Sequence, residues 1–379
     1  MKRSFSILAA TLLSLGLAAC DKSAKQETQK PESPQQGSNE QQSGSDLPDH
    51  QGPIPSPDPD SGLPRIQPRP LEQIPQGTFG DKVRQGYQLF VNTQQLKGRY
   101  VGNDLNCVNC HLDAGRRAGA APLWAAYFSY PAYRKKNDRV NSFAERIQGC
   151  FTYSQNGAPP PKESAEIRAL SAYAYWLAVG GMMDHQGIDG KVPEISDADL
   201  ITGARREDFP LPEDIAQALP LDQRDKLPGR GYPKLDKPGR VYSLEEGAEV
   251  YAEHCAGCHG GDGQGSQAAG IYNLPPLWGK GSYNWGAGMH RVNTAAAFIY
   301  TNMPLGKGIQ LTLQQAWDVA AYINSHERPQ DPRLAEFGGD VEKLRERYHQ
   351  NTGYYGEEVD GKVLGEHSFP DFRQLQGTR

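Results

Sequence analysis

The chain has 379 residues, of which 45 are acidic and 40 basic, so its formal net charge at pH 7 is −5. This slightly acidic balance argues against nucleic acid as a partner, because nucleic-acid binding needs clustered positive charge. The length beyond about residue 75 suits two domains better than one.

Residues 1–19 are predicted to be a lipoprotein-type signal peptide, with a positively charged start and an apolar run too short to span a bilayer. The stretch from Leu17 to Cys20 resembles a bacterial lipobox. This predicts a lipid on Cys20 and an exported protein anchored at the periplasmic face of a bacterial membrane. Asp21 favours the inner membrane. The alternative is an ordinary signal peptide followed by an incidental cysteine.

Residues 20–75 are predicted to be a flexible tether between the membrane and the folded part. They are rich in Pro, Gln, Ser and Gly and contain almost no large apolar side chains. Such a composition buries too little apolar surface to offset the loss of chain entropy on folding. A polar segment of this kind acts as a flexible spacer.

Four of the six cysteines fall in two copies of Cys-x-x-Cys-His. In haem c attachment, two thiols at this spacing form thioethers with the porphyrin, and the histidine ligates iron. The alternative is a zinc site or a redox dithiol, which two copies in an exported chain disfavour. The sequence therefore predicts two covalently bound haem c groups. Their attachment residues are Cys107, Cys110 and His111 for haem 1, and Cys255, Cys258 and His259 for haem 2.

The two halves of the folded part share one plan. Before its haem motif, each half has a helical segment with a glycine that would allow a close helix crossing. Further short matches follow in the same order, and each half closes with a helical pattern whose aromatic residues favour packing. Together these matches indicate a duplicated domain. The paired features are Gly86 and Gly247, Pro122-Leu123-Trp124 and Pro276-Leu277-Trp278, Arg139-Val140-Asn141 and Arg291-Val292-Asn293, and the helical patterns at 167–177 and 313–323.

The predicted fold is all-α, with two cytochrome c-like domains that each surround one haem. The N-terminal domain, at 76–232, holds haem 1 and the active site, and the C-terminal domain, at 233–330, holds haem 2. Residues 178–240, rich in Pro, Asp and Gly, are expected to cover or link the domains. Residues 331–379 are expected to wrap back as an irregular extension.

The sixth ligand of haem 2 is predicted to be a methionine. Met303 precedes a proline some forty residues after His259, which is the usual arrangement for His/Met coordination in small cytochromes. Met289 is the competing candidate.

Cys150 occupies the corresponding place in the first half. It lies nine residues beyond Asn141, whereas Met303 lies ten beyond Asn293. With four thiols on haem and one on lipid, Cys150 has no partner for an intrachain disulfide, although the compartment is oxidising. It is interpreted as a thiolate ligand of haem 1, which would lower the potential of that haem. A small buried apolar side chain is the alternative.

The chain resembles the thiosulfate dehydrogenase family of dihaem cytochromes over most of residues 80–330. The matching stretches are 106–115, 145–151, 156–157 and 302–306. The stretch around Cys150 is the specific one, because ordinary dihaem cytochromes lack it. The resemblance implies His/Cys ligation at haem 1, with thiosulfate chemistry beside it, and His/Met ligation at haem 2. A Lys/Met ligand exchange, known in one member, is not expected, because Asn302 stands at the lysine position.

The implied reaction joins two thiosulfates into tetrathionate and passes two electrons to an acceptor such as another periplasmic cytochrome c or a small copper protein. Cationic side chains must bring the two dianions together. Arg146 lies four residues before Cys150 and Arg139 seven before Arg146, near one face of a helix, and the family resemblance places an arginine at the position of Arg146. Arg116 and Arg117 are alternatively expected at haem propionates. The Cys150 sulfur is expected to take up a thiosulfate-derived sulfur, which the second thiosulfate then attacks.

Two other functions remain open from the sequence. A dihaem peroxidase carries two similar motifs but needs an open iron face and no thiolate. A membrane-tethered electron shuttle needs two closed haems and leaves Cys150 unexplained. The same site can also run in reverse as a tetrathionate reductase, because the direction depends on the haem potentials.

Overall fold

The computed structural model describes residues 68–134, 137–185, 187, 189–202, 231–268, 271–306, 310–350 and 353–376. The predicted signal peptide, Cys20 and nearly all of the predicted tether lie outside these residues. The chain divides into two units, 1–46 and 47–379, and all described residues belong to the second. Among the described residues, no helix combines the length and the apolar character needed to cross a membrane.

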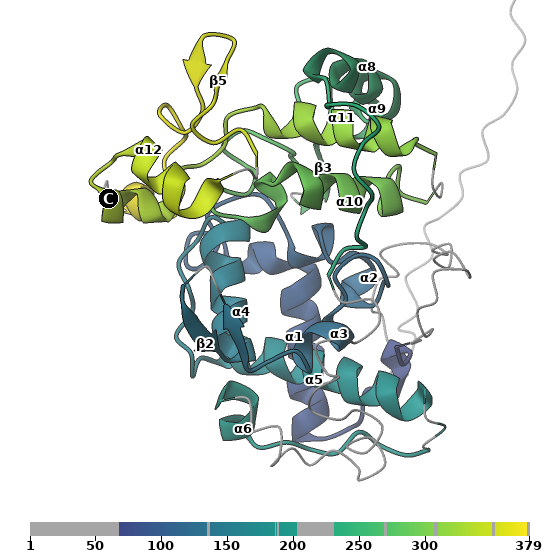
Figure 1. Cartoon of the computed structure of the whole chain (residues 1–379). Coiled ribbons are helices and arrows are strands. Elements are labelled where there is room, and N and C mark those ends of the chain that lie inside the picture. The colour runs from purple at the N-terminus through teal and green to yellow at the C-terminus, as the bar shows by residue number, and fades with distance from the viewer. Residues whose placement is uncertain are drawn as a thin grey trace, which may run out of the picture. The chain divides into compact units, whose positions relative to one another are not determined.

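The N-terminal half is built on two long helices, α1 and α5, which pack against each other (Figure 1). The haem motif lies in a short 3-10 helix between them. The bounds are α1 Thr78–Val91, η4 Cys107–Asn109, α2 Leu112–Gly115, α3 Leu123–Tyr127, β1 Ala132–Arg134, β2 Arg139–Asn141, α4 Phe143–Gly149, the π-helix η5 Cys150–Ser154, α5 Ala165–His185 and α6 Asp197–Thr202.

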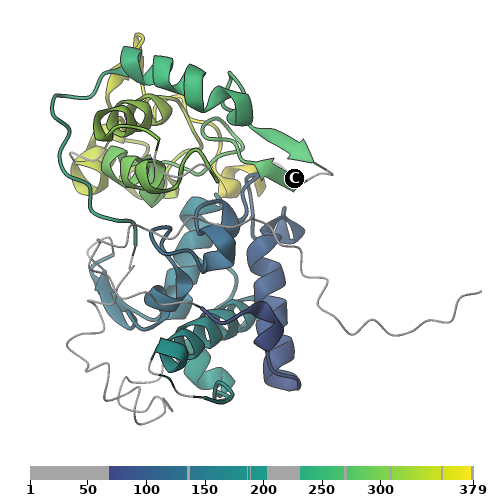
Figure 2. The ribbon, with the colours of Figure 1, turned by 90° about the vertical axis from the view of Figure 1, so that its right-hand side faces the viewer.

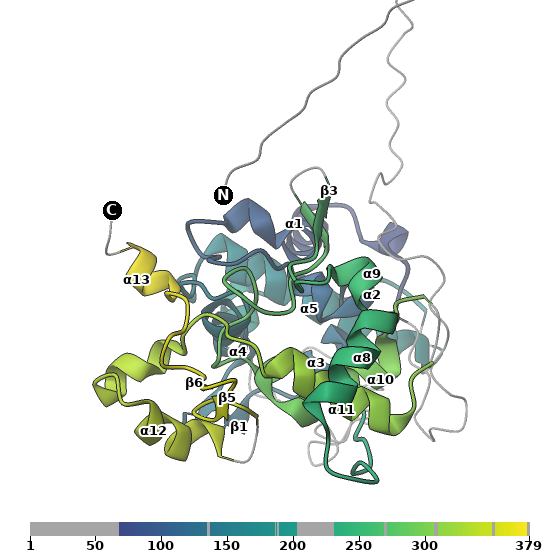
Figure 3. The ribbon, with the colours of Figure 1, turned by 90° about the horizontal axis from the view of Figure 1, so that it is seen from above.

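The C-terminal half repeats this arrangement with α8 and α11, and α10 packs beside α11 (Figure 3). The second haem motif spans the end of α8 and the short α9. The bounds are α8 Leu244–His254, α9 Ala256–His259, β3 Ser266–Ala268, β4 Ile271–Leu274, η7 Gly288–His290, α10 Val292–Asn302 and α11 Leu313–Asn324.

Gly86 and Gly247 lie where the paired helices cross. A Cβ atom at Gly86 would lie 2.0 Å from the carbonyl oxygen of Ala169 in α5. At Gly247 it would lie 2.2 Å from the carbonyl oxygen of Asp318 in α11. Neither backbone oxygen can move without shifting its helix, so glycine permits the close approach in both halves. The duplicated glycines have the role that the sequence predicted.

Each half has its own apolar core. The N-terminal core gathers side chains of α1, α3 and α5, and the C-terminal core those of α8, α10 and α11. Leu112 and Ala120, which follow the first haem motif in the chain, belong to the C-terminal core. Among the described residues the strands form only two-stranded antiparallel hairpins, so the prediction of an all-α fold with two similar halves is confirmed.

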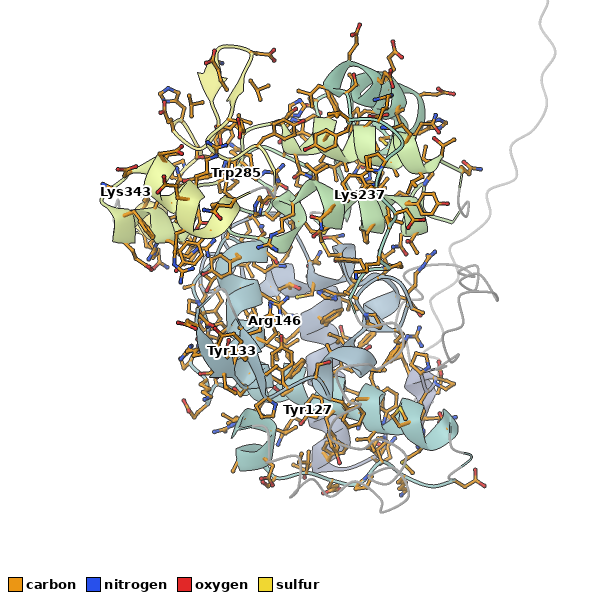
Figure 4. The ribbon with its side chains drawn as sticks, in the orientation of Figure 1. Tyr127, Tyr133, Arg146, Lys237, Trp285 and Lys343 are labelled. Carbon is orange, nitrogen blue, oxygen red and sulfur yellow. The ribbon has the colours of Figure 1, made fainter. Side chains whose placement is uncertain are left out.

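The C-terminal extension consists of short elements that contact both halves. It packs Leu344, Tyr355 and Leu364 around Trp285 of the C-terminal half (Figure 4), and Phe372 reaches Gly102 of the N-terminal half. Figure 2 shows these elements from a second side. The bounds are η8 Pro332–Phe337, α12 Val341–Leu344, the π-helix η9 Arg345–His349, β5 Glu358–Val359, β6 Lys362–Val363 and α13 Phe372–Gln376.

Candidate active site

A cavity in the N-terminal half has an empty volume of about 1270 Å³, part of it open to solvent. Most of its wall comes from the N-terminal half, but Tyr283 and Met289 contribute from the C-terminal half. The cavity brings together five residues predicted from the sequence, namely Cys107, Cys110, His111, Arg146 and Cys150.

The two haem-motif histidines are held in the same way. Nδ1 of His111 lies 2.6 Å from the carbonyl oxygen of Ala121, and Nδ1 of His259 lies 2.9 Å from that of Pro275. Each carbonyl directly precedes a Pro-Leu-Trp repeat. Because a carbonyl only accepts, each Nδ1 carries the hydrogen and each Nε2 keeps its lone pair for a metal. Burial lowers the pKa of both rings, for His111 to about 4.

The cysteines of the first motif suit thioether formation. The backbone N–H of Cys107 donates to Thr93 Oγ1 at 3.0 Å, and that hydroxyl donates to Cys107 Sγ at 3.3 Å. Burial raises the pKa of the Cys107 and Cys110 thiols to about 12. The surroundings therefore favour uncharged sulfur, which a thioether provides.

Cys150 stands at a break in helix geometry. Ser142 and Glu145 form a reciprocal capping box that starts α4, and the chain passes directly from α4 into the π-helix Cys150–Ser154. Single π-helical turns are frequent at functional sites. Nη1 of Arg146, one helical turn earlier, donates to Cys150 Sγ at 3.1 Å. Cys150 is the main cause that raises the pKa of Arg146, so this guanidinium keeps its charge.

The backbone of the π-helix is hydrogen-bonded from both halves of the molecule. The side-chain amide of Asn284 donates to the carbonyl of Thr152 at 2.9 Å, and its backbone N–H donates to that of Tyr153 at 3.2 Å. The amide of Asn103 donates to the carbonyl of Ser154 at 2.8 Å. Both asparagines are buried. The position of Cys150 therefore depends on contacts that cross between the two cytochrome domains.

The structure separates the two predicted catalytic arginines. Arg139 does not line the described part of the cavity; its side chain is 59% exposed and lies 3.5 Å from Glu145. Arg134 lines the cavity instead and donates to Tyr130 at 3.1 Å. The sequence analysis missed Arg134, which pairs with Arg139 across the β1–β2 hairpin. The signal for that hairpin was a short turn around Asn137-Asp138, too weak to set a register.

The arginines that follow the first haem motif differ from each other. Arg116 is paired with Asp113 at 2.6 Å. Arg117 is 8% exposed, and among the described residues its Nη1 has no hydrogen-bond partner. A buried guanidinium without a partner is costly, and a haem propionate would satisfy it. Arg117 therefore fits the propionate role better than Arg116.

At the second haem motif, Cys255 is half-buried and Cys258 is exposed. Met303 follows α10 directly, and both Met303 and Cys255 pack against the C-terminal core. Met289 packs there too, but it also lines the cavity of the first half. This placement supports Met303 as the haem 2 ligand, an assignment that stays a prediction.

Comparison with known proteins gives a consistent picture. Residues 98–183 match the family described as "SoxA/TsdA, cytochrome c domain", and residues 244–327 match "Cytochrome c". The thiosulfate dehydrogenase of Stutzerimonas stutzeri is 50% identical over 303 residues, which cover 79% of this chain and 85% of that protein. That of Thiomonas intermedia is 42% identical over 307 residues, which cover 81% and 84%.

A solved structure is also similar, namely the thiosulfate dehydrogenase TsdBA from Marichromatium purpuratum in its "as isolated" form. The TM-score is 0.66 at 45% sequence identity, and the match covers 80% of this chain and 58% of that one. The chain thus spans less than two thirds of that relative. Identities of this size over most of the chain, two matching haem domains and a cavity that gathers the attachment residues lead to one conclusion. The chain belongs to the thiosulfate dehydrogenase family of dihaem c-type cytochromes, and it is an oxidoreductase with two covalently bound haem c groups.

Proposed function

We propose that the protein oxidises two thiosulfates to tetrathionate and passes the two electrons to a periplasmic acceptor such as another cytochrome c. The observation that carries this proposal is the contact between Cys150 and Arg146 inside the cavity that also contains His111, Cys107 and Cys110. A sulfur nucleophile beside a charged guanidinium suits a sulfur-containing dianion.

We propose that Cys150 and His111 would ligate the iron of haem 1, and Met303 and His259 that of haem 2. When bound, the haem groups would supply two one-electron acceptors. Arg117 and the tautomer of His111 support this arrangement from the protein side, because one offers a buried guanidinium nitrogen without a hydrogen-bond partner among the described residues and the other a free Nε2.

In the proposed reaction, Cys150 forms and then releases an S–S bond in two steps. Its thiolate forms an S–S bond with the outer sulfur of one thiosulfate, and this step releases two electrons. The outer sulfur of the second thiosulfate then attacks the cysteine-bound sulfur that came from the first. This forms the central S–S bond of tetrathionate, breaks the bond to Cys150 and returns the thiolate.

The arginines assist these two reaction steps by stabilising negative charge. Arg146 stabilises the thiolate that leaves, and we propose that Arg134, with Arg146, binds the sulfonate groups of the dianions. Arg139 was the other predicted catalytic arginine; in this arrangement its exposure and its pairing with Glu145 favour a peripheral role.

The test is the variant Cys150→Ala, measured with thiosulfate, tetrathionate and hydrogen peroxide on one preparation. Two haems per chain with no thiosulfate or tetrathionate turnover are expected. Normal turnover would remove Cys150 from the mechanism. Peroxide turnover by the wild type would favour a dihaem peroxidase, and reduction of the wild type by a protein donor but not by thiosulfate would favour an electron shuttle. The two sulfur assays together also report the direction, including tetrathionate reduction.

We further propose that the protein works at the periplasmic face of a membrane, held by a lipid on Cys20. The proposal is supported by the lipobox-like stretch that ends at this residue. Incorporation of a radiolabelled fatty acid tests it. Label should enter the wild type and be absent from Cys20→Ser, which should then leave the membrane fraction. Equal labelling of both proteins would contradict the anchor.

A further inference from the structure

A buried group of charged side chains in the C-terminal extension reaches the turn that carries Cys150. Asp331 is its centre. Nη2 and Nε of Arg333 donate to its carboxylate at 2.6 and 3.0 Å, and Nε2 of His349 lies 2.9 Å from Oδ2. Asp331 is 0%, His349 2% and Arg333 6% exposed. One carboxylate therefore fixes two cationic or potentially cationic side chains away from water.

Arg333 connects this group to the active site. Its guanidinium carbon lies 5.1 Å from the ring centroid of Tyr153 and 3.9 Å from that of Tyr348, within cation–π range of both. Tyr153 belongs to the π-helix that begins at Cys150. Because Asp331 accepts from both Nε and Nη2, it fixes one edge of the guanidinium. Arg333 therefore presents a fixed face to a residue three positions from the proposed nucleophile.

His349 connects the same group to a second part of the cavity wall. Its Nδ1 lies 3.0 Å from Nε2 of His290, and Nδ1 of His290 bonds the carbonyl of Ala287. His290 directly follows Met289, which lines the cavity. The extension thus contacts two segments that carry wall residues, at Tyr153 beside Ser154 and at His290 beside Met289.

Acceptors lie at both ends of the histidine pair. His290 Nδ1 faces the Ala287 carbonyl, and His349 Nε2 faces the Asp331 carboxylate. Although burial alone would raise it, hydrogen bonds from His349 and Arg333 hold the pKa of Asp331 below its usual range. The two rings are joined by the contact of 3.0 Å between His349 Nδ1 and His290 Nε2.

We propose that Arg333 and His349, oriented by Asp331, are positioning residues of the active site, which fix the Cys150 turn and the segment 287–290 that carries the wall residue Met289. The C-terminal extension is then a functional part of the active site. The inference rests on the proposed role of Cys150. Small displacements matter here, since about 1 Å of misplacement can cost about a hundredfold in rate.

The test compares Arg333→Gln with Arg333→Lys and the matched control Arg373→Gln in the full-length holoenzyme. Arg373 lies in the same extension, but its side chain is 54% exposed and lies 3.6 Å from Asp371. Two readouts are used. One is kcat and KM for thiosulfate, and the other is the rate at which iodoacetamide alkylates Cys150, followed by peptide mass spectrometry.

Arg333→Gln is expected to lower kcat by about 10–100-fold, with little change in KM, and to accelerate Cys150 alkylation several-fold. Arg333→Lys should recover part of both, and Arg373→Gln should match the wild type. Wild-type kcat and alkylation in Arg333→Gln would overturn the proposal. A rise in KM with unchanged kcat would also overturn it, because that result would mean that Arg333 binds the anion itself.

A second variant covers the case in which Arg333→Gln does not fold. Tyr153→Leu removes the ring beneath Arg333 and leaves the Asp331 cluster intact. It should show the same kcat loss and faster alkylation, and unchanged values would again overturn the proposal. The proposed function fails separately, through turnover by Cys150→Ala. If Cys150→Ala is inactive while both positioning variants behave as wild type, only the positioning role is wrong.

Discussion

Replacing Arg146 with Gln should cost a large and calculable part of the catalytic rate. Nη1 of Arg146 makes one hydrogen bond of 3.1 Å to Cys150 Sγ, and both residues are half-buried in a cavity that is partly open to solvent. A hydrogen bond to a charged group contributes about 1.5–3 kcal/mol. At about 1.36 kcal/mol per tenfold, its loss corresponds to roughly 10–150-fold in kcat/KM. Glutamine is too short and uncharged, so it can replace neither the contact nor the charge.

The assay is initial-rate kinetics with thiosulfate and an artificial one-electron acceptor, after the haem content has been shown to equal that of the wild type. Arg146→Lys keeps the charge but not the planar fork, so it should lose less than Arg146→Gln. For Arg139→Gln, kcat/KM should fall by less than about threefold, since an exposed ion pair contributes little. Arg134→Gln should instead raise KM for thiosulfate. A larger loss in Arg139→Gln than in Arg146→Gln would refute the reasoning and restore Arg139 as the catalytic arginine.

Three further outcomes follow from the packing. Gly247→Ala should lower the free energy of unfolding, measured in guanidinium, by ~1–3 kcal/mol, because the new methyl meets Asp318 O at 2.2 Å. Gly261→Ala, where a Cβ would have nothing within 4 Å, should leave it unchanged. Asn284→Ala should cost about 1–3 kcal/mol in the same assay, because it removes the donor to the Thr152 carbonyl and to Oδ1 of the buried Asn156, and equal unfolding midpoints would contradict this. The pKa of Asp331 lies below its ordinary value of 3.8 in the folded state, so its stabilisation is present above that pH and fades as the pH falls below it. The difference in melting temperature between the wild type and Asp331→Asn should therefore shrink below about pH 4, and a constant difference would argue against an ionised Asp331.

Much of the scaffold was predictable because its determinants are local or repeated. The Cys-x-x-Cys-His motifs identify the haem groups through their own chemistry. The repeated glycines identified the helix crossings, because the same constraint appears twice in one chain. The repeated Pro-Leu-Trp marked the carbonyls that orient His111 and His259, although its role became visible only in the structure.

Other parts of the site depend on long-range packing that a single sequence does not encode in any short pattern. Arg134 enters the cavity because of the register of a three-residue hairpin. Asn284 reaches the Cys150 turn from the other half of the chain, 132 positions from Thr152. Arg333 and His349 lie in a segment predicted only as an irregular extension. In each case the relevant partner is distant in sequence, so neither spacing nor periodicity points to it.

The duplicated halves differ most at the position proposed to face the haem iron, and the local backbone explains how one scaffold offers two kinds of sulfur. In the second half Arg291 itself caps α10, which runs to Asn302, and Met303 follows in an extended conformation. In the first half the matching Arg139 lies in a strand, Ser142 caps the shorter α4, and Cys150 continues the helix as a π-turn.

A residue that continues a helix has a neighbour one turn earlier on the same face, so Cys150 acquires Arg146, whereas Met303 lies beyond its helix and rests against an apolar core. A charged partner stabilises a thiolate, and a thioether needs none. We infer that the continuation of the helix through Cys150, rather than the exchange of Met for Cys alone, is what would accommodate an anionic sulfur in the first half. A Cys introduced at position 303 should accordingly not reproduce the reactivity of Cys150. Comparable alkylation rates at the two positions would show that the arginine one turn earlier is dispensable.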